Sequence, residues 1–278
     1  MSCFCPVCKN TINEDSVKCS VCNFTGLHRE FITKEDAQEW FDATVLPYRK
    51  QWETKKTDLK DFEIEGTFLK KYKGTADKVT IPQIVTSIGV YAFSSCDNLK
   101  TVTIQNGVTR IEAFAFSNCR NLTTVTIPDS VRYVSSSAFW GCENLKSLTV
   151  DSDNKYFYST DGVLYRRKRK NKRIFVKCPS GKKETTITIP AGVTGIADSA
   201  FCANHNLTTV MIPDSVVSIG GSAFSLCQNL TIVMIPDSVV SIGVDSFKYC
   251  NKLTIHCQRN SYAHKYAIEH NIPVQFID

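Results

Sequence analysis

The sequence predicts an α/β repeat fold, a solenoid with a parallel sheet on one face, joined to a small metal-binding module. Three observations predict it: a 23-residue spacing of apolar residues, an interruption shared by every marker of that spacing, and four N-terminal cysteines in two close pairs. The 278 residues suffice for one large domain or two ordinary ones. We expect a module at 1–27, a linker region at 28–60 and the repeat domain at 61–278.

The N-terminal segment contains two C-x-x-C pairs separated by ten residues. Two such turns bring four thiolates to one tetrahedral point, which is the arrangement of structural Zn²⁺ sites. Four cysteines leave no open coordination position, so we expect a structural metal on which the folding of this short segment depends. The sequence therefore predicts a zinc ribbon with Zn²⁺ held by Cys5, Cys8, Cys19 and Cys22.

The linker region is predicted to contain a helix from Thr33 to about Lys56, with Pro47 kinking or splitting it. Trp40 and Trp52 belong to an apolar stripe at helical spacing. The stripe could pack on the neighbouring ribbon or first repeat, or it could form a surface for a partner helix or for self-association.

The repeat is marked by three columns of apolar residues that share one period and one interruption of about sixteen residues. The columns are Ile81, Ile104, Ile127, Val150, Ile189, Ile212 and Ile235; Phe93, Phe116, Phe139, Phe201, Phe224 and Phe247; and Leu99, Leu122, Leu145, Leu207, Leu230 and Leu253. One such unit cannot bury its own apolar face, so stacking of units is required. We expect seven or eight stacked coils.

Within a unit, Leu122-Thr-Thr-Val-Thr-Ile127 has the L-x-x-L-x-L form of a leucine-rich-repeat strand. Apolar and polar residues alternate as in a strand with one buried face, and Pro128 ends it because proline cannot donate to the ladder. Cys96, Cys119, Cys142, Cys227 and Cys250 each follow the repeat phenylalanine by three residues. We expect them to form a buried column of free thiols, because equivalent side chains point in parallel.

The wording of the repeat, Ile-Pro-Asp-Ser-Val…Ser-Ile-Gly…Ser-Ala-Phe…Cys…Asn-Leu in residues 212–230, resembles that of the BspA-like leucine-rich-repeat family of bacterial proteins. The resemblance covers about residues 62–278. It implies a right-handed solenoid and a binding role, often adhesion to host proteins at the cell surface.

The interruption is predicted to be a basic hairpin inserted near 156–183, and residues 258–278 are predicted to cap the solenoid, with Ser261 as a helix N-cap. Between residues 166 and 183 there are ten Lys/Arg and no Asp/Glu, and the rest of the chain holds 23 basic and 27 acidic residues. The net charge of +6 therefore comes from one segment. Its hairpin cluster is Arg166, Arg167, Lys168, Arg169, Lys170, Lys172 and Arg173.

The second candidate surface is the outward side of the repeat strands. The residue before the last apolar position is threonine in the earlier coils and becomes Met211 and Met234 in two adjacent ones, with Ile232 beside them. Methionine is adaptable and common on binding surfaces. The alternative is that the C-terminal cap covers these residues.

No nucleophile elbow, phosphate loop or carboxylate pair at a defined spacing is present, so we expect no enzyme activity. The sequence has no run of eighteen apolar residues, so no membrane span is expected, and its first residues lack an apolar signal region. We therefore expect a cytoplasmic interaction scaffold that binds a protein partner through the sheet face and the hairpin. The alternatives are a cell-surface adhesin and a nucleic-acid-associated factor using the ribbon and the hairpin.

Overall fold

The computed structural model describes residues 3–4, 11–12, 59–169 and 172–277. The chain divides into two compact units, residues 1–63 and 64–278. In the first unit, β1 (Cys3–Phe4) and β2 (Thr11–Ile12) pair antiparallel and bracket the first C-x-x-C pair. The four predicted zinc ligands and the Trp40–Trp52 helix lie outside the described residues.

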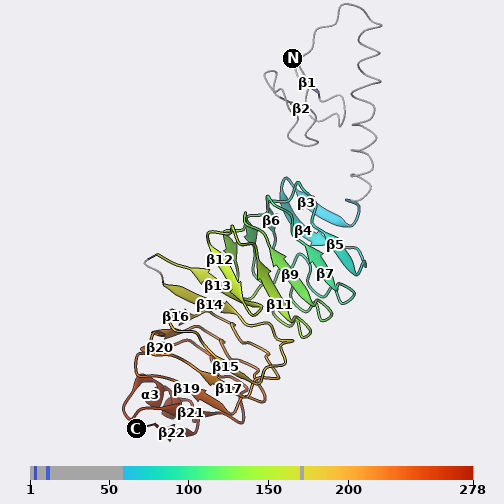
Figure 1. Ribbon diagram of the computed structural model, residues 1–278. Helices are drawn as coiled ribbons and strands as arrows, with labels where there is room; N and C mark the ends of the chain where they lie inside the picture. Colours follow the sequence, from blue (N-terminus) through green and yellow to red (C-terminus); the bar gives the residue numbers. More distant parts are fainter. Residues whose placement is uncertain (1–2, 5–10, 13–58, 170–171, 278) are drawn as a thin grey trace, which may run out of the picture. The chain divides into compact units, whose positions relative to one another are not determined.

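The second unit is a leucine-rich-repeat β-solenoid of about nine turns, slightly more than the sequence predicts (Figure 1). The predicted repeat strands stack in parallel at a constant register, as in Thr103↔Thr126. We call this stack the threonine ladder. It consists of β5 (Lys78–Thr80), β7 (Thr101–Thr103), β9 (Thr124–Ile127) and β11 (Ser147–Val150), then β15 (Thr186–Thr188), β17 (Thr209–Met211), β19 (Ile232–Met234), β21 (Thr254–Cys257) and β22 (Val274–Phe276).

The prediction of a sheet on one face is incomplete, because the return path of each turn also forms short parallel strands. In the Ser-Ile-Gly segments the isoleucine is buried and the serine before it is not, and the two residues form a short strand. We call this stack the return ladder. It consists of β4 (Phe68–Tyr72), β6 (Ser87–Ile88), β8 (Arg110–Ile111) and β10 (Tyr133–Val134), with β3 (Phe62–Glu65) beside β4, then β14 (Arg173–Lys177), β16 (Val193–Ile196), β18 (Ser218–Ile219) and β20 (Ser241–Ile242).

The core between the two ladders is built from stacked identical side chains. Phe93, Phe116 and Phe139 are buried, with ring centroids 5.0 and 5.5 Å apart. Phe201, Phe224 and Phe247 repeat this stack at 4.7 and 5.2 Å. The predicted phenylalanine column is therefore confirmed, and burial of these rings supplies much of the driving force for stacking.

The buried cysteine column is confirmed for Cys119, Cys142, Cys227 and Cys250, whereas Cys96 is half-buried. The column also has a polar function that the sequence did not reveal. Each buried thiol donates to the carbonyl of the phenylalanine in the preceding turn, as Cys119 Sγ does to Phe93 O and Cys142 Sγ to Phe116 O, both at 3.0 Å. The repeat cysteines are free thiols. They fill the core and also satisfy carbonyls at the bend of the chain.

Close approach of successive turns explains the glycine that ends the Ser-Ile-Gly strands. A Cβ atom added to Gly243 would lie 2.4 Å from the backbone nitrogen of Gly221 in the preceding turn. The next corner tightens further through residues with positive φ, and Asn118, Gly141 and Leu226 occupy equivalent positions there with φ of 56°, 72° and 64°.

Both ladders stop where the insertion enters, at residues 151–183, which we call the junction. β10 and β11 end the first stack, and β14 and β15 belong to the sheets of the second. Between them, β12 (Phe157–Thr160) pairs antiparallel with β13 (Val163–Arg167), which pairs antiparallel with β14. The hairpin thus begins inside the return ladder and projects from it (Figure 1).

The second stack ends in α3 (Tyr262–Glu269) and β22. The Ser261 side chain accepts a hydrogen bond from His264 N, and Ala263, Tyr266 and Ala267 are buried, which confirms the predicted N-cap and apolar face. α3 is the single helix among the described residues of the solenoid, so the α/β class overstates its helix content.

Candidate interaction surfaces

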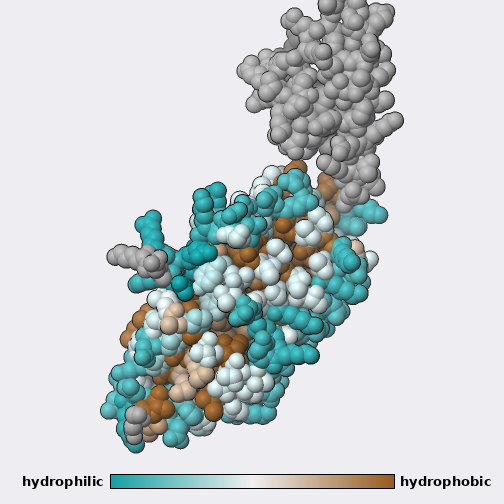
Figure 2. Space-filling view, in the orientation of Figure 1, coloured by the Kyte–Doolittle hydropathy of each residue, from teal (hydrophilic) through white to brown (hydrophobic). Residues whose placement is uncertain are grey.

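The structure brings Met211, Ile232 and Met234 together on the outward side of the threonine ladder. β17 and β19 place Met211 opposite Met234 and Thr209 opposite Ile232, while Val210 and Val233 between them point into the core. Met211 is 36% exposed and the other two are half-buried. The C-terminal cap therefore leaves Met211 accessible, and Figure 2 shows hydrophobic colouring over this part of the solenoid.

The equivalent surface of the first stack is polar. Thr80 and Thr103 are opposite each other and exposed, and the hydroxyls of Thr126 and Thr149 are 3.0 Å apart. The same backbone thus presents hydroxyls in one stack and an apolar patch in the other.

The hairpin places its described basic residues in solvent. Arg166, Arg167, Lys168, Arg169, Lys172 and Arg173 are exposed, and Lys170 lies outside the described residues. Lys168 N donates to Lys172 O at 2.8 Å and closes the turn. Figure 2 shows the hairpin as a hydrophilic projection. It extends from the sheet of the return ladder, so it and the methionine patch belong to different sheets.

Two arginines of the hairpin are held over Tyr158, a residue that the sequence did not single out. The guanidinium carbons of Arg167 and Arg173 lie 4.8 and 5.9 Å from the centre of its ring. Burial raises the pKa of Tyr158, and the charges of the two arginines oppose that rise. The sequence signal for this residue would have been a tyrosine in the strand that pairs with the basic strand of the predicted hairpin.

Lys177 is a second residue that the sequence did not single out, and its side chain is only 1% exposed. It lies 23 residues before Ala200, in the column of small buried residues that includes Ala92, Ala115 and Ala223. Cys178 N donates to Ala200 O just as Phe201 N donates to Ala223 O, so the register is kept. Cys178 occupies the phenylalanine position of the repeat, and Phe175 supplies the ring that stacks on Phe201 in its place.

The surroundings of Lys177 are polar but incompletely paired. Its ammonium donates to Ser199 O at 2.9 Å, and burial lowers its pKa. Burial raises the pKa of the nearby Cys142 and Cys178 thiols to about 12. Within the described residues, two buried atoms have no hydrogen-bond partner, Ser180 Oγ and Asn204 Oδ1, and both belong to residues near Cys178. Among the described residues, the buried side-chain atoms without a partner therefore lie at Ser180 in the junction and at Asn204 in the turn that follows it.

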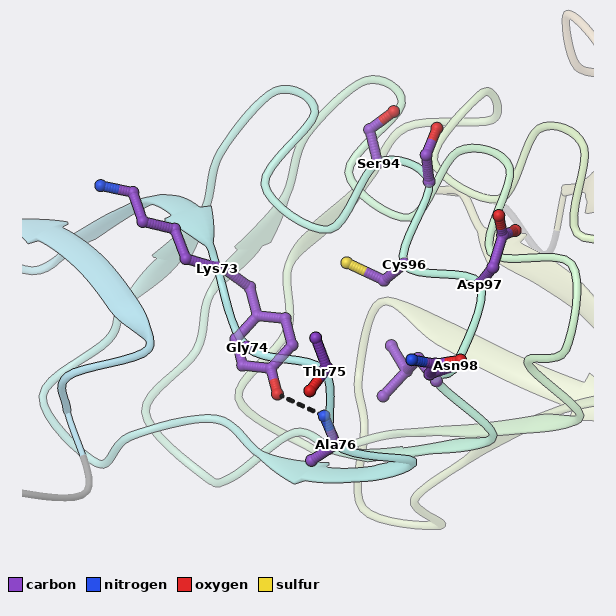
Figure 3. A pocket seen from close by; sticks show the side chains of 11 residues that line it. Lys73, Gly74, Thr75, Ala76, Ser94, Cys96, Asp97 and Asn98 are labelled. Carbon is purple, nitrogen blue, oxygen red and sulfur yellow. Dashed lines mark hydrogen bonds between the residues drawn. The ribbon is translucent and has the colours of Figure 1, made fainter.

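A depression of about 300 Å³ lies near the N-terminal end of the solenoid (Figure 3). Its walls include Tyr72, whose hydroxyl accepts from Ala76 N, and the half-buried Cys96. A hydrogen bond from Cys119 lowers the pKa of the Cys96 thiol. In Figure 3, the side chains of Lys73 and Asp97 extend away from each other.

Two other features of the described residues bear on function. In this part of the chain, no three His, Cys, Asp or Glu side chains gather as metal ligands would. In the same residues, no helix has the length and apolarity needed to cross a membrane.

The protein-family model described as the BspA type leucine-rich repeat region matches the sequence in six copies, over residues 64–161 and 171–272. Among curated proteins, none matches the sequence significantly.

Three solved bacterial structures are similar in fold. A leucine-rich cell surface protein from Faecalibacterium prausnitzii is 29% identical, with a TM-score of 0.52 over 69% of this chain and 62% of that one. The pneumococcal vaccine antigen PcpA is 19% identical, with a TM-score of 0.54 over 73% and 68%. A leucine-rich-repeat protein from Eubacterium ventriosum is 24% identical, with a TM-score of 0.51 over 69% and 66%. This chain thus spans less than two thirds of the Faecalibacterium protein.

Proposed function

Because the chain belongs to the BspA-type leucine-rich-repeat family, we propose that it is a binding scaffold without catalytic activity, whose partner is a protein. Proteins of this repeat family are typically non-enzymatic binding proteins. The observation that carries the proposal is the change along the threonine ladder from hydroxyls at Thr80 and Thr103 to an apolar patch at Met211, Ile232 and Met234.

The patch would contribute affinity by desolvation, at roughly 25 cal/mol per Å² of apolar area removed from water. The hairpin would contribute long-range attraction, which is screened within about 10 Å at 0.1 M salt. The two surfaces should therefore respond differently to ionic strength.

The test is a capture experiment with the full chain, comparing Met211→Asp/Met234→Asp with the matched variant Thr80→Asp/Thr103→Asp. Both variants add two carboxylates at opposed outward positions of the ladder. We expect the wild type and the threonine variant to capture the same proteins at both low and high salt. The methionine variant should fail to capture those proteins. Retention of the same proteins by the methionine variant would contradict the proposal.

The relative named as a leucine-rich cell surface protein supports a surface location, with an adhesin role, over the cytoplasmic location expected from the sequence. Cell fractionation with protease shaving of intact cells distinguishes the two locations. Nucleic-acid binding through the ribbon and the hairpin is a second candidate, supported by the ten Lys/Arg between residues 166 and 183. Salt-dependent retention of DNA or RNA tests it.

The N-terminal segment is proposed to be a zinc ribbon. Four thiolates from Cys5, Cys8, Cys19 and Cys22 suit structural Zn²⁺, and the β1–β2 pairing around the first C-x-x-C pair suits a knuckle there. The Trp40–Trp52 stripe is proposed as a self-association surface, for which dilution-dependent sedimentation is the test.

A further inference from the structure

The hairpin carries a feature more specific than its charge. In the register of β13 and β14, Arg167 and Arg173 are directly opposite each other. Like charges at directly opposed positions on antiparallel strands destabilise the pair. Within the described residues, no carboxylate lies at salt-bridge distance from either guanidinium, so no opposite charge among them offsets this repulsion.

The two arginines are nevertheless held in place. Both lie over the ring of Tyr158, at 4.8 and 5.9 Å from its centre. The ring of Tyr158 stacks on Tyr165 at 5.0 Å, and Tyr165 contacts the buried Phe175 edge-on at 5.2 Å. Phe175 in turn stacks on Phe201 of the core at 4.5 Å. A chain of aromatic contacts therefore anchors both guanidinium groups to the core.

From this arrangement we propose that Arg167 and Arg173, positioned by Tyr158, form a clamp for carboxylates of an acidic segment in the protein partner. The guanidinium group presents paired N–H donors in a fixed plane that fits a carboxylate, and prior positioning reduces the entropy lost on binding. The clamp specifies the chemical class of partner that the hairpin would bind, so it rests on the proposed binding function.

An acidic protein segment fits better than a nucleic acid. Single-stranded nucleic acids bind through several aromatic faces on which successive bases stack. Here the Tyr158 ring lies between the arginines and Tyr165, and Tyr165 is only 4% exposed. Tyr156, at 40% exposure, is a single neighbouring ring. The clamp thus offers charge and planar hydrogen bonding rather than a stacking platform.

The experiment measures binding of a fluorescent hexaglutamate peptide to the full chain by anisotropy at low salt. We expect Arg167→Gln/Arg173→Gln to weaken binding about fivefold to tenfold, the combined effect of two surface ion pairs. Lys78→Gln/Lys146→Gln removes the same charge from exposed positions elsewhere in the solenoid and should change binding less than about twofold. Arg167→Lys/Arg173→Lys keeps the charge and should recover only part of the affinity.

Tyr158→Leu tests the positioning. We expect it to weaken hexaglutamate binding while the melting temperature stays near that of the wild type, because Tyr158 is only partly buried.

Two results would overturn the clamp. The first is an equal loss of hexaglutamate binding in Arg167→Gln/Arg173→Gln and in Lys78→Gln/Lys146→Gln. The second is tighter binding of a hexathymidine oligonucleotide than of hexaglutamate. Failure of the clamp is distinguishable from failure of the scaffold. If Met211→Asp/Met234→Asp still abolishes partner capture while hexaglutamate does not bind, the clamp alone is wrong.

Discussion

The regular turns and the junction follow the same 23-residue spacing but bury different chemistry. In the regular turns, small and aromatic residues alternate in the core, and a buried hydroxyl such as Ser246 Oγ is bonded to Gly220 O and Gly243 O. At the junction a lysine replaces the small residue and the Ser180 hydroxyl is unpaired, and Asn204 in the following turn also has an unpaired atom. In a repeat, one arrangement that satisfies the buried polar groups recurs in every turn. An insertion interrupts that arrangement, so its own residues must supply the hydrogen-bond partners.

The N-terminal segment should extend this comparison furthest, because its sequence does not carry the 23-residue spacing. We expect one Zn²⁺ per chain, contributing about 10–16 kcal/mol to folding of residues 1–27. Cys8→Ser should unfold that segment and leave the melting of the solenoid nearly unchanged, as seen by elemental analysis and calorimetry. Zinc-free protein with reduced thiols, or loss of the solenoid transition, would contradict this.

Phe116→Ala should remove about 3–5 kcal/mol from the free energy of unfolding, because Phe116 is fully buried between two rings. Phe224→Ala should cost a similar amount if the two stacks are equivalent. Val240→Ala, at a position 65% exposed, is the control and should change little. A loss below about 1 kcal/mol at Phe116 in urea denaturation would show that the column is not the main core.

At the junction, substitution of a buried residue should raise the free energy of unfolding instead of lowering it. Lys177→Met should stabilise the solenoid by about 1–3 kcal/mol near neutral pH, because it removes an under-bonded buried amine. Lys146→Met, on the exposed surface, should have almost no effect.

The pH dependence gives a second measurement of Lys177. Burial lowers its pKa, so between the folded pKa and 10.5 the unfolded chain binds more protons and wild-type stability rises with pH. The advantage of Lys177→Met should therefore shrink as the pH rises from the folded pKa of Lys177 toward 10.5. Thiol titration acts in the opposite direction, because burial raises the pKa of Cys142 and Cys178, but it takes place in both proteins and cancels in their difference. A gap that widens over this range would contradict the assignment.

The smallest effect on stability should come from the positive-φ corner, where different turns carry different residues at the equivalent position. Leu226 has φ of 64° where Asn118 and Gly141 occupy the equivalent positions. Leu226→Asn should stabilise by about 0.5 kcal/mol, since asparagine tolerates the left-handed region, and Leu226→Val should destabilise. Thermal melts that move in the same direction for both variants would rule out backbone strain as the cause.

The period in the sequence was sufficient to place the strands, the phenylalanine and cysteine columns and the Ser261 cap, because each is dictated by local residue type at a fixed spacing. It did not reveal the return ladder, since a strand of two residues has too little alternation to be recognised. Lys177 was missed for a different reason. Its burial depends on the hairpin strand β14, which the period does not describe. The clamp at Tyr158 depends on which strand lies opposite the basic one, and only pairing of β12 with β13 determines that.

The interruption of both ladders at the junction also has a mechanical consequence. Among the described residues, only a few backbone hydrogen bonds join the first stack to the junction, including Gly181 N to Leu145 O and Leu148 N to Gly162 O. Within each stack, by contrast, every strand is bonded to its neighbours along the whole ladder. Tension applied along the stacking axis should therefore separate the solenoid first between β11 and β15, with each stack moving as a stiff block. A single-molecule pulling trace should then show one early yield followed by two larger rupture events.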